Sequence, residues 1–150
     1  MNKEAAAMEY RPYSRRVNYY ETDQMAIVHH SNYIRWFEEA RLDFLDQVGL
    51  NYREMEKTGL IVPVVDVSCR YHVSAKYDDL MDIYAYLTSF NGVRMDYRYE
   101  VRFHSSGVLS ADGTSSHCFL DEKRHPVIVK RRDPALFAHL KELVEKNENL

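Results

Sequence analysis

Residues 31–48 read SNYIRWFEEARLDFLDQV, and Gly49 follows them. Apolar positions recur at intervals of three and four residues, at Tyr33, Phe37, Ala40, Phe44 and Val48. This spacing predicts a helix of about seventeen residues, with Ser31 or Asn32 as its N-cap and Gly49 just past its end. Trp36 widens the apolar stripe, so we expect the helix to pack into a concave surface.

Apolar and polar residues alternate in the segments that flank this helix, which is the pattern of half-buried strands. The alternation is complete over residues 93–104. The predicted strands span residues 13–20, 65–72, 80–90, 93–104 and 108–120. Asn91-Gly92 predicts a two-residue hairpin, and Gly113 inside the last strand predicts the close approach of another backbone.

Asp133-Pro134 supplies an N-cap followed by proline at the first helical position, which predicts an amphipathic helix through Val144. A sheet with one polar and one apolar face needs a cover, and the long helix can provide it. The expected fold class is α+β, with a sheet of about five antiparallel strands wrapped around one central helix, and a C-terminal helix. We expect residues 13–150 to form this single domain and residues 1–12 to be a loose N-terminal segment.

Composition excludes several classes of protein. The net charge of −3 disfavours a general nucleic-acid binder. A membrane-spanning run of about eighteen apolar residues is missing, and residues 1–10 hold no apolar segment of the kind found in secretory signals. Cys69 and Cys118 lie far apart, which predicts two reduced, buried thiols in a cytoplasmic protein.

The loop before the long helix carries the reactive groups. Asp23, His29 and His30 lie there, immediately before a helix N-terminus with unpaired N–H groups and a positive dipole end. Such an end can stabilise an oxyanion, and a nearby carboxylate can attack a carbonyl or activate water. From chemistry alone, Asp23 also fits a turn or capping residue and His30 a helix-start histidine. His29-His30 is a poor metal pair, because adjacent side chains diverge.

Residues 19–45, YYETDQMAIVHHSNYIRWFEEARLDFL, add a family resemblance. Tyr19, Asp23, His30, Asn32 and Tyr33 match the signature of hotdog-fold acyl-CoA thioesterases of the 4-hydroxybenzoyl-CoA thioesterase class, in particular the branch associated with the Tol–Pal cluster. A second match is Ala75–Leu80, AKYDDL, which is similar to the family's turn before a strand. The resemblance covers about residues 13–130.

The resemblance implies an acyl-CoA thioesterase with a curled antiparallel sheet, assembled as a homodimer or homotetramer with active sites at the dimer interface. Asp23 would be the nucleophile or general base, with His30 and Tyr19 orienting it, water or substrate. Backbone N–H groups near His30 would polarise the thioester carbonyl. The substrate would be an acyl-CoA or acyl-carrier-protein thioester, and no metal or redox cofactor would be required.

One departure from the family concerns Met25-Ala26, where the family often has glycine. If that site needs a positive φ, Ala26 is expected to be strained.

Two other functions stay open. The first is a hotdog hydratase or dehydratase acting on enoyl or 3-hydroxyacyl thioesters, although that class calls for a closer Asp–His spacing than Asp23 and His30 have. The second is a non-catalytic acyl-thioester binding module. The related sensors carry a DNA-binding extension, and residues 1–12 are too short for a helix-turn-helix.

Overall fold

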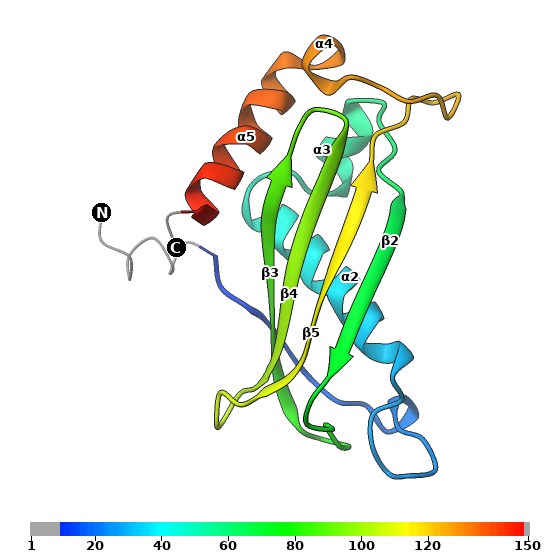
Figure 1. Ribbon diagram of the computed structural model, residues 1–150, viewed down its shortest axis with the longest axis vertical. Coiled ribbons are helices and arrows are strands. Elements are labelled where there is room, and N and C mark those ends of the chain that lie inside the picture. The colour runs from blue at the N-terminus through cyan, green and yellow to red at the C-terminus, as the bar shows by residue number, and fades with distance from the viewer. Residues whose placement is uncertain (1–9, 149–150) are drawn as a thin grey trace.

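The structure is a computed structural model that describes residues 10–148, and one antiparallel sheet with the strand order β1-β3-β4-β5-β2 organises it (Figure 1). The strands are β1 (Tyr13–Arg16), β2 (Val64–Tyr71), β3 (Leu80–Phe90), β4 (Arg94–Phe103) and β5 (Leu109–Cys118). The helices are α2 (Ser31–Gln47), α3 (Tyr52–Lys57), α4 (Val129–Arg132) and α5 (Pro134–Glu148), with a 3-10 turn η1 (Tyr19–Glu21).

The long helix α2 lies against one face of this sheet, which confirms the α+β prediction (Figure 1). Its buried side chains are Tyr33, Trp36, Phe37, Ala40 and Phe44, as the predicted stripe required, whereas Val48, the last residue of that stripe, is the C-cap and is only half-buried. The Phe37 ring stacks on Tyr99 of β4 with centroids 4.4 Å apart. A Cβ added at Gly113 would lie 2.2 Å from the Ser68 carbonyl oxygen and 2.7 Å from Phe37, so the close approach predicted there is confirmed.

The two ends of α2 differ in how well the sequence predicted them. At the C-terminus, Gly49 has a φ of 79°, and the Leu50 N–H donates to the Leu45 carbonyl at 2.8 Å, as in a Schellman motif. At the N-terminus the predicted cap is wrong. His30 is the N-cap, and Ser31 is already helical.

The first strand and the β3–β4 hairpin also depart from the prediction. β1 ends at Arg16, and the chain then turns through η1. In the hairpin the Asn91 N–H donates to the Arg94 carbonyl at 3.1 Å, so Gly92 and Val93 are the central turn residues. Gly92 takes a φ of 90° there, which only glycine adopts without strain.

The strand β2 is an edge strand, and most of its residues are exposed. Its predicted apolar face is not buried within the chain, because Val65, Val67 and Tyr71 keep 40–48% of their surface exposed. Cys69 and Cys118 are free thiols, but they are half-buried and not buried as predicted. Burial is still enough to raise the pKa of Cys69 above its ordinary value.

Helix α5 packs against β3, and its predicted N-cap is confirmed, because the Leu136 N–H donates to Asp133 Oδ1 at 3.1 Å. The short helices α3 and α4 were not predicted. Of the expected loose segment 1–12, residues 1–9 lie outside the described residues, and Arg11 N–H donates to Gln47 Oε1 at 3.0 Å. Within the described part of the chain, every helix is too short or too polar to cross a membrane.

Candidate active site

Asp23 lies in a tight loop that its own carboxylate helps to hold. Its Oδ1 accepts the Met25 N–H at 2.8 Å, its carbonyl accepts the Ala26 N–H at 3.0 Å, and its N–H donates to the Ile27 carbonyl at 2.9 Å. No other hydrogen bond to the carboxylate is present among residues 10–148, which leaves Oδ2 available. The loop therefore fixes the orientation of Asp23 while keeping one oxygen free to react.

The loop contains the strained residue that the sequence predicted. Ala26 has a φ of 62°, a left-handed conformation that costs an L-residue with a Cβ roughly 1–2 kcal/mol. Ala26→Gly is therefore expected to raise the free energy of unfolding by about 1 kcal/mol, measured as a higher urea midpoint at an unchanged slope. The matched control is Ala138→Gly on α5, where the same change should cost about 1 kcal/mol. A loss of stability in both variants would contradict a strained Ala26.

His30 lies at the N-terminus of α2 and holds an available backbone donor. The neighbouring amides are engaged, because the Ser31 N–H donates to His29 Nδ1 at 3.2 Å and the Asn32 N–H donates to the His29 carbonyl at 3.0 Å. The His30 N–H has no acceptor within the described residues. Of the predicted carbonyl-polarising groups, the His30 amide is thus the available one, at the positive end of the helix dipole.

Asp23 and His30 line one cleft of about 170 Å³. The rest of its wall comes from the loop, from Tyr33 on α2, and from the end of β2 and the segment after it, at Tyr71, His72, Val73 and Ser74. The Tyr71 hydroxyl donates to the His30 carbonyl at 2.9 Å and so joins the end of β2 to the start of α2. Burial is the main cause that raises the pKa of Tyr71 to about 12, so its hydroxyl stays protonated.

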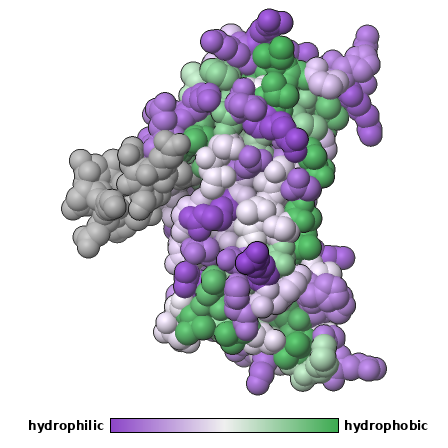
Figure 2. Space-filling model, in the orientation of Figure 1, coloured by the Kyte–Doolittle hydropathy of each residue, from purple (hydrophilic) through white to green (hydrophobic). Residues whose placement is uncertain are grey.

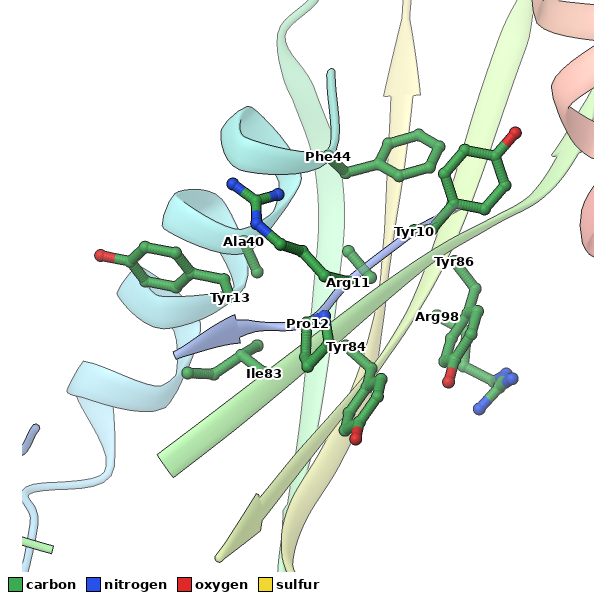
Figure 3. Close-up of a pocket in the computed structure, with 11 residues that line it drawn as sticks. Tyr10, Arg11, Pro12, Tyr13, Ala40, Phe44, Ile83, Tyr84, Tyr86 and Arg98 are labelled. Carbon is green, nitrogen blue, oxygen red and sulfur yellow. The ribbon is translucent and has the colours of Figure 1, made fainter. Parts of the chain in front are cut away.

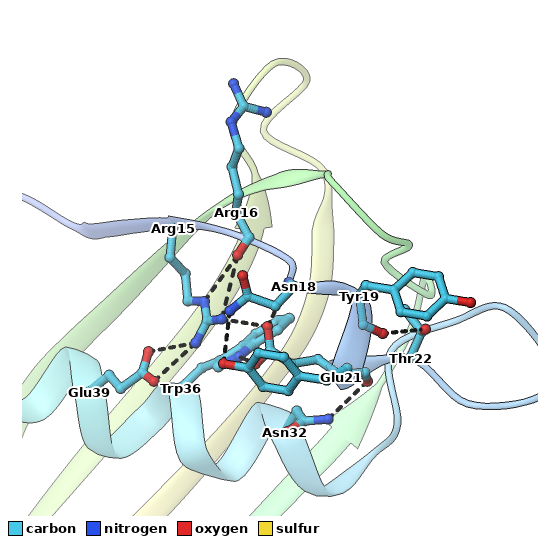
Figure 4. A network of polar contacts seen from close by, with 10 residues as sticks. Arg15, Arg16, Asn18, Tyr19, Glu21, Thr22, Asn32, Trp36 and Glu39 are labelled. Atoms are coloured by element: carbon cyan, nitrogen blue, oxygen red, sulfur yellow. Dashed lines mark hydrogen bonds and ion pairs between the residues drawn. The ribbon is translucent and has the colours of Figure 1, made fainter.

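Tyr19, the third predicted site residue, is not brought to this cleft. Its side chain is 77% exposed, and its ring meets Tyr77 edge-on at 5.6 Å. Figure 4 shows the Tyr19 ring pointing away from the Glu21 cluster. Asp23 and His30 share a wall, although no hydrogen bond joins their side chains.

Glu21 holds the loop in place through its hydrogen bonds (Figure 4). The sequence interpretation did not identify it as a supporting residue. Its carboxylate accepts from Arg15, from Trp36 Nε1 at 2.8 Å and from the Asn18 N–H at 2.8 Å. Its carbonyl accepts the His29 N–H at 2.8 Å. This buried network ties β1, η1 and α2 together and sets the position of the loop that carries Asp23.

Comparison with known proteins places the chain in a family. A model described as the thioesterase-like superfamily matches residues 17–143. The chain belongs to this superfamily.

The similarity extends to individual members of the thioesterase-like superfamily. A Bacillus subtilis protein named "Putative acyl-CoA thioesterase YneP" is 35% identical over 116 residues, which is 77% of this chain and 83% of that protein. The acyl-CoA thioesterase YbgC of Haemophilus influenzae is 28% identical over 128 residues, covering 84% of this chain and 93% of that protein. The structure of a DHNA-CoA thioesterase from Staphylococcus aureus has a TM-score of 0.85 at 29% identity, covering 92% and 93% of the two chains. The predictions of a hotdog fold and of a thioester hydrolase are thus confirmed at the level of class.

A different cavity, of about 260 Å³, lies where the segment before β1 crosses β3 (Figure 3). Its wall includes Tyr84, Tyr86 and Arg98, and the Arg98 guanidinium lies 4.3 Å from the centre of the Tyr86 ring. The wall contains no carboxylate and no imidazole. This cavity therefore offers no carboxylate or imidazole that could attack a carbonyl or act as a general base, and the Asp23 cleft is the better candidate.

Proposed function

We propose that this protein hydrolyses acyl-CoA thioesters, with Asp23 as nucleophile or general base. The observation that carries the proposal is the shared cleft, where Asp23 keeps a free carboxylate oxygen and His30 keeps a free backbone N–H. A carboxylate and an amide donor on one wall are the two groups that acyl transfer requires.

The chemistry follows from these two groups. Sulfur donates poorly into a thioester carbonyl, so the carbonyl carbon is electrophilic enough for a carboxylate to attack it or to activate a water against it. The negative charge that develops on the carbonyl oxygen is stabilised by the His30 N–H at the helix N-terminus. The carbon–sulfur bond then breaks, CoA leaves as the thiolate and takes up a proton, and water supplies the second oxygen of the acid. This route uses no metal or redox cofactor.

A screen of purified protein against acyl-CoA esters tests the proposal. Free CoA is detected with a thiol-reactive dye, and loss of the enoyl absorbance is followed with crotonyl-CoA. Thiol release supports the thioesterase. Hydration without thiol release would favour the hydratase, and tight acyl-CoA binding without either reaction would favour a binding module.

Finer assignments are part of the same proposal. The signature residues support the Tol–Pal-associated branch of the 4-hydroxybenzoyl-CoA thioesterase class, and an acyl-carrier-protein thioester is an alternative substrate. A cytoplasmic location is supported by the two free thiols. Tyr19 stays a prediction, and activity of Tyr19→Phe equal to that of the unmodified protein would remove it from the site.

We also infer that two chains assemble through β2. An eight-residue edge strand offers unpaired N–H and C=O groups, and its valines are exposed, with Val64 at 51% and Val67 at 40%. Figure 2 shows hydrophobic surface along this side of the molecule. Pairing with a second copy would satisfy the backbone and bury the side chains, and the homodimer would be the unit from which a homotetramer forms.

Val67→Lys tests this edge. A charge placed at the centre of the paired strands is expected to halve the mass measured by light scattering. Hydrolysis is expected to fall on the order of a hundredfold, because the active sites are expected at the dimer interface and a displacement of about 1 Å between reacting groups lowers the rate by that factor. The control is Val93→Lys, since Val93 is also exposed, at 44%, but lies in the β3–β4 turn. A Val67→Lys protein that keeps the mass of the unmodified protein would refute assembly through β2.

A further inference from the structure

A cavity with a largely apolar wall lies away from Asp23, at the other half of α2. Its volume is about 560 Å³, within the range of small-molecule sites. Apolar side chains from α2, α3, the segment before β2, the end of β5 and α5 form much of its wall, among them Leu42, Leu45, Met55, Leu60, Phe119 and Leu140. Neither Asp23 nor His30 borders it.

One cation borders this apolar space without a counter-ion. Arg41 is half-buried, and its single hydrogen bond within the described residues goes from Nη1 to the Tyr99 hydroxyl at 3.0 Å. The described residues place no carboxylate oxygen within 4.0 Å of its guanidinium. A guanidinium carries five N–H donors, so most of those of Arg41 are left without a protein acceptor.

A chain of hydrogen bonds holds Arg41 in this position. The Tyr99 hydroxyl bonds to Ser115 Oγ at 2.6 Å, and Ser115 Oγ bonds to His117 Nε2 at 2.8 Å. His117 also borders the cavity. Burial, with the Arg41 charge as a smaller cause, lowers the pKa of His117 to about 4. His117 is therefore neutral at pH 7, and Arg41 is the cation that this wall presents.

We propose that this cavity binds the acyl group of the thioester substrate, and that Arg41 selects acyl groups that carry a neutral oxygen, a hydroxyl or oxo group, at the end remote from the thioester. The proposal rests on the proposed thioesterase function. The apolar wall holds the carbon skeleton, and the spare guanidinium donors bond the oxygen. Glu38 and Glu56 border the same cavity without an ion-pair partner among the described residues and would repel a carboxylate, which favours the neutral oxygen. Glu122, the third glutamate of the wall, is paired with Arg132 at 2.7 Å.

The partner's loop would bring the reacting carbonyl to this cavity. Within one chain, His30 and Arg41 are separated by about 16 Å along α2. Two β2 strands paired antiparallel about a two-fold axis place the Tyr71 end of one strand beside the Val64 end of the other. The Tyr71 hydroxyl binds the His30 carbonyl, and Val62, just before Val64, borders the cavity. The partner's Asp23 cleft would then open beside the Arg41 cavity.

Matched substrate pairs test the role of Arg41. The pairs are octanoyl-CoA with ω-hydroxyoctanoyl-CoA, and benzoyl-CoA with a hydroxybenzoyl-CoA, and suberoyl-CoA supplies a terminal carboxylate. We expect the unmodified protein to prefer the hydroxy member of at least one pair by about 10- to 100-fold in kcat/KM, as a hydrogen bond to a charged group provides. Arg41→Met should bring that ratio to near one, because kcat/KM should fall for the hydroxy substrate alone. Arg41→Lys should keep part of the preference. Suberoyl-CoA should be the poorest of the three aliphatic substrates.

The controls separate specificity from folding and from catalysis. Arg131→Met removes the same charge from an exposed position on α4 and should leave the ratio unchanged. Thermal unfolding shows whether Arg41→Met is folded. If it is not, Arg41→Lys takes its place as the test variant, and its hydroxy preference should be smaller than that of the unmodified protein. A ratio near one in the unmodified protein, or a ratio that survives in folded Arg41→Met, would overturn the proposal. Calorimetric binding of ω-hydroxyoctanamide against octanamide, which are both uncharged, probes the same cavity without turnover. A protein that hydrolyses nothing would therefore refute the function and not the cavity.

Mixing Asp23→Asn chains with Arg41→Met chains tests the composite site. A hybrid dimer would contain one site with an intact Asp23 and an intact Arg41 from different chains, and hydroxy-selective hydrolysis should return. If both groups acted within one chain, every site would stay defective, and the absence of selective activity would overturn the proposed arrangement.

Discussion

Asp23→Asn is expected to lower kcat for thioester hydrolysis by about 10²- to 10⁴-fold, the range that a positioned acid–base group contributes. Asparagine keeps the oxygen that accepts the Met25 N–H, so the loop should retain its conformation. The variant loses the carboxylate that would attack the carbonyl or activate water. The measurement is CoA release from the best acyl-CoA of the screen, with binding of the same ester followed separately.

The control for this variant is Asp46→Asn, which removes the same charge from an exposed position on α2. Its kcat should match that of the unmodified protein, and both variants should keep the mass and the melting temperature. A folded Asp23→Asn protein that retains more than about a tenth of the activity would exclude Asp23 as the catalytic carboxylate.

Glu21→Gln is expected to lower the free energy of unfolding by about 3 kcal/mol, because it leaves the buried Arg15 charge with one carboxylate fewer. The side chains of Arg15 and Glu21 are only 12% and 4% exposed, so water cannot replace the lost interaction. Glutamine has a single acceptor oxygen, whereas Trp36 Nε1 and the Asn18 N–H donate to different oxygens of Glu21, so one of these buried donors also loses its acceptor. For a domain of this size the melting temperature should fall by roughly 6–12 °C.

Glu39→Gln is the matched control, since Glu39 pairs with the same Arg15 at 2.8 Å but is 39% exposed. Solvent can screen and replace this outer interaction, so the expected loss is below about 1 kcal/mol. Equal losses in the two variants would contradict a special role for the buried carboxylate of Glu21.

The sequence by itself determined those parts of the fold that depend on local patterns. The apolar spacing from Tyr33 to Phe44 identified α2 and its buried face, and the complete alternation in residues 93–104 identified β4. Gly49, Gly113 and the strained Ala26 were also predictable, because a positive φ or a lack of space for a Cβ acts on a single residue. The signature in residues 19–45 indicated the family, and with it Asp23 and His30.

Only the tertiary structure decided which residues line the same cleft and which polar groups are left without a hydrogen-bond partner. Tyr19 matches the family signature yet faces away from the cleft, because the chain leaves the strand at Arg16 and turns through η1. The local pattern around Glu21 and Arg15 gives no sign of their role, and burial against Trp36 makes them an anchor. The exposure of β2 and the unpaired guanidinium of Arg41 depend on strand order and on contacts between residues far apart in the chain, which periodicity along a single segment does not encode.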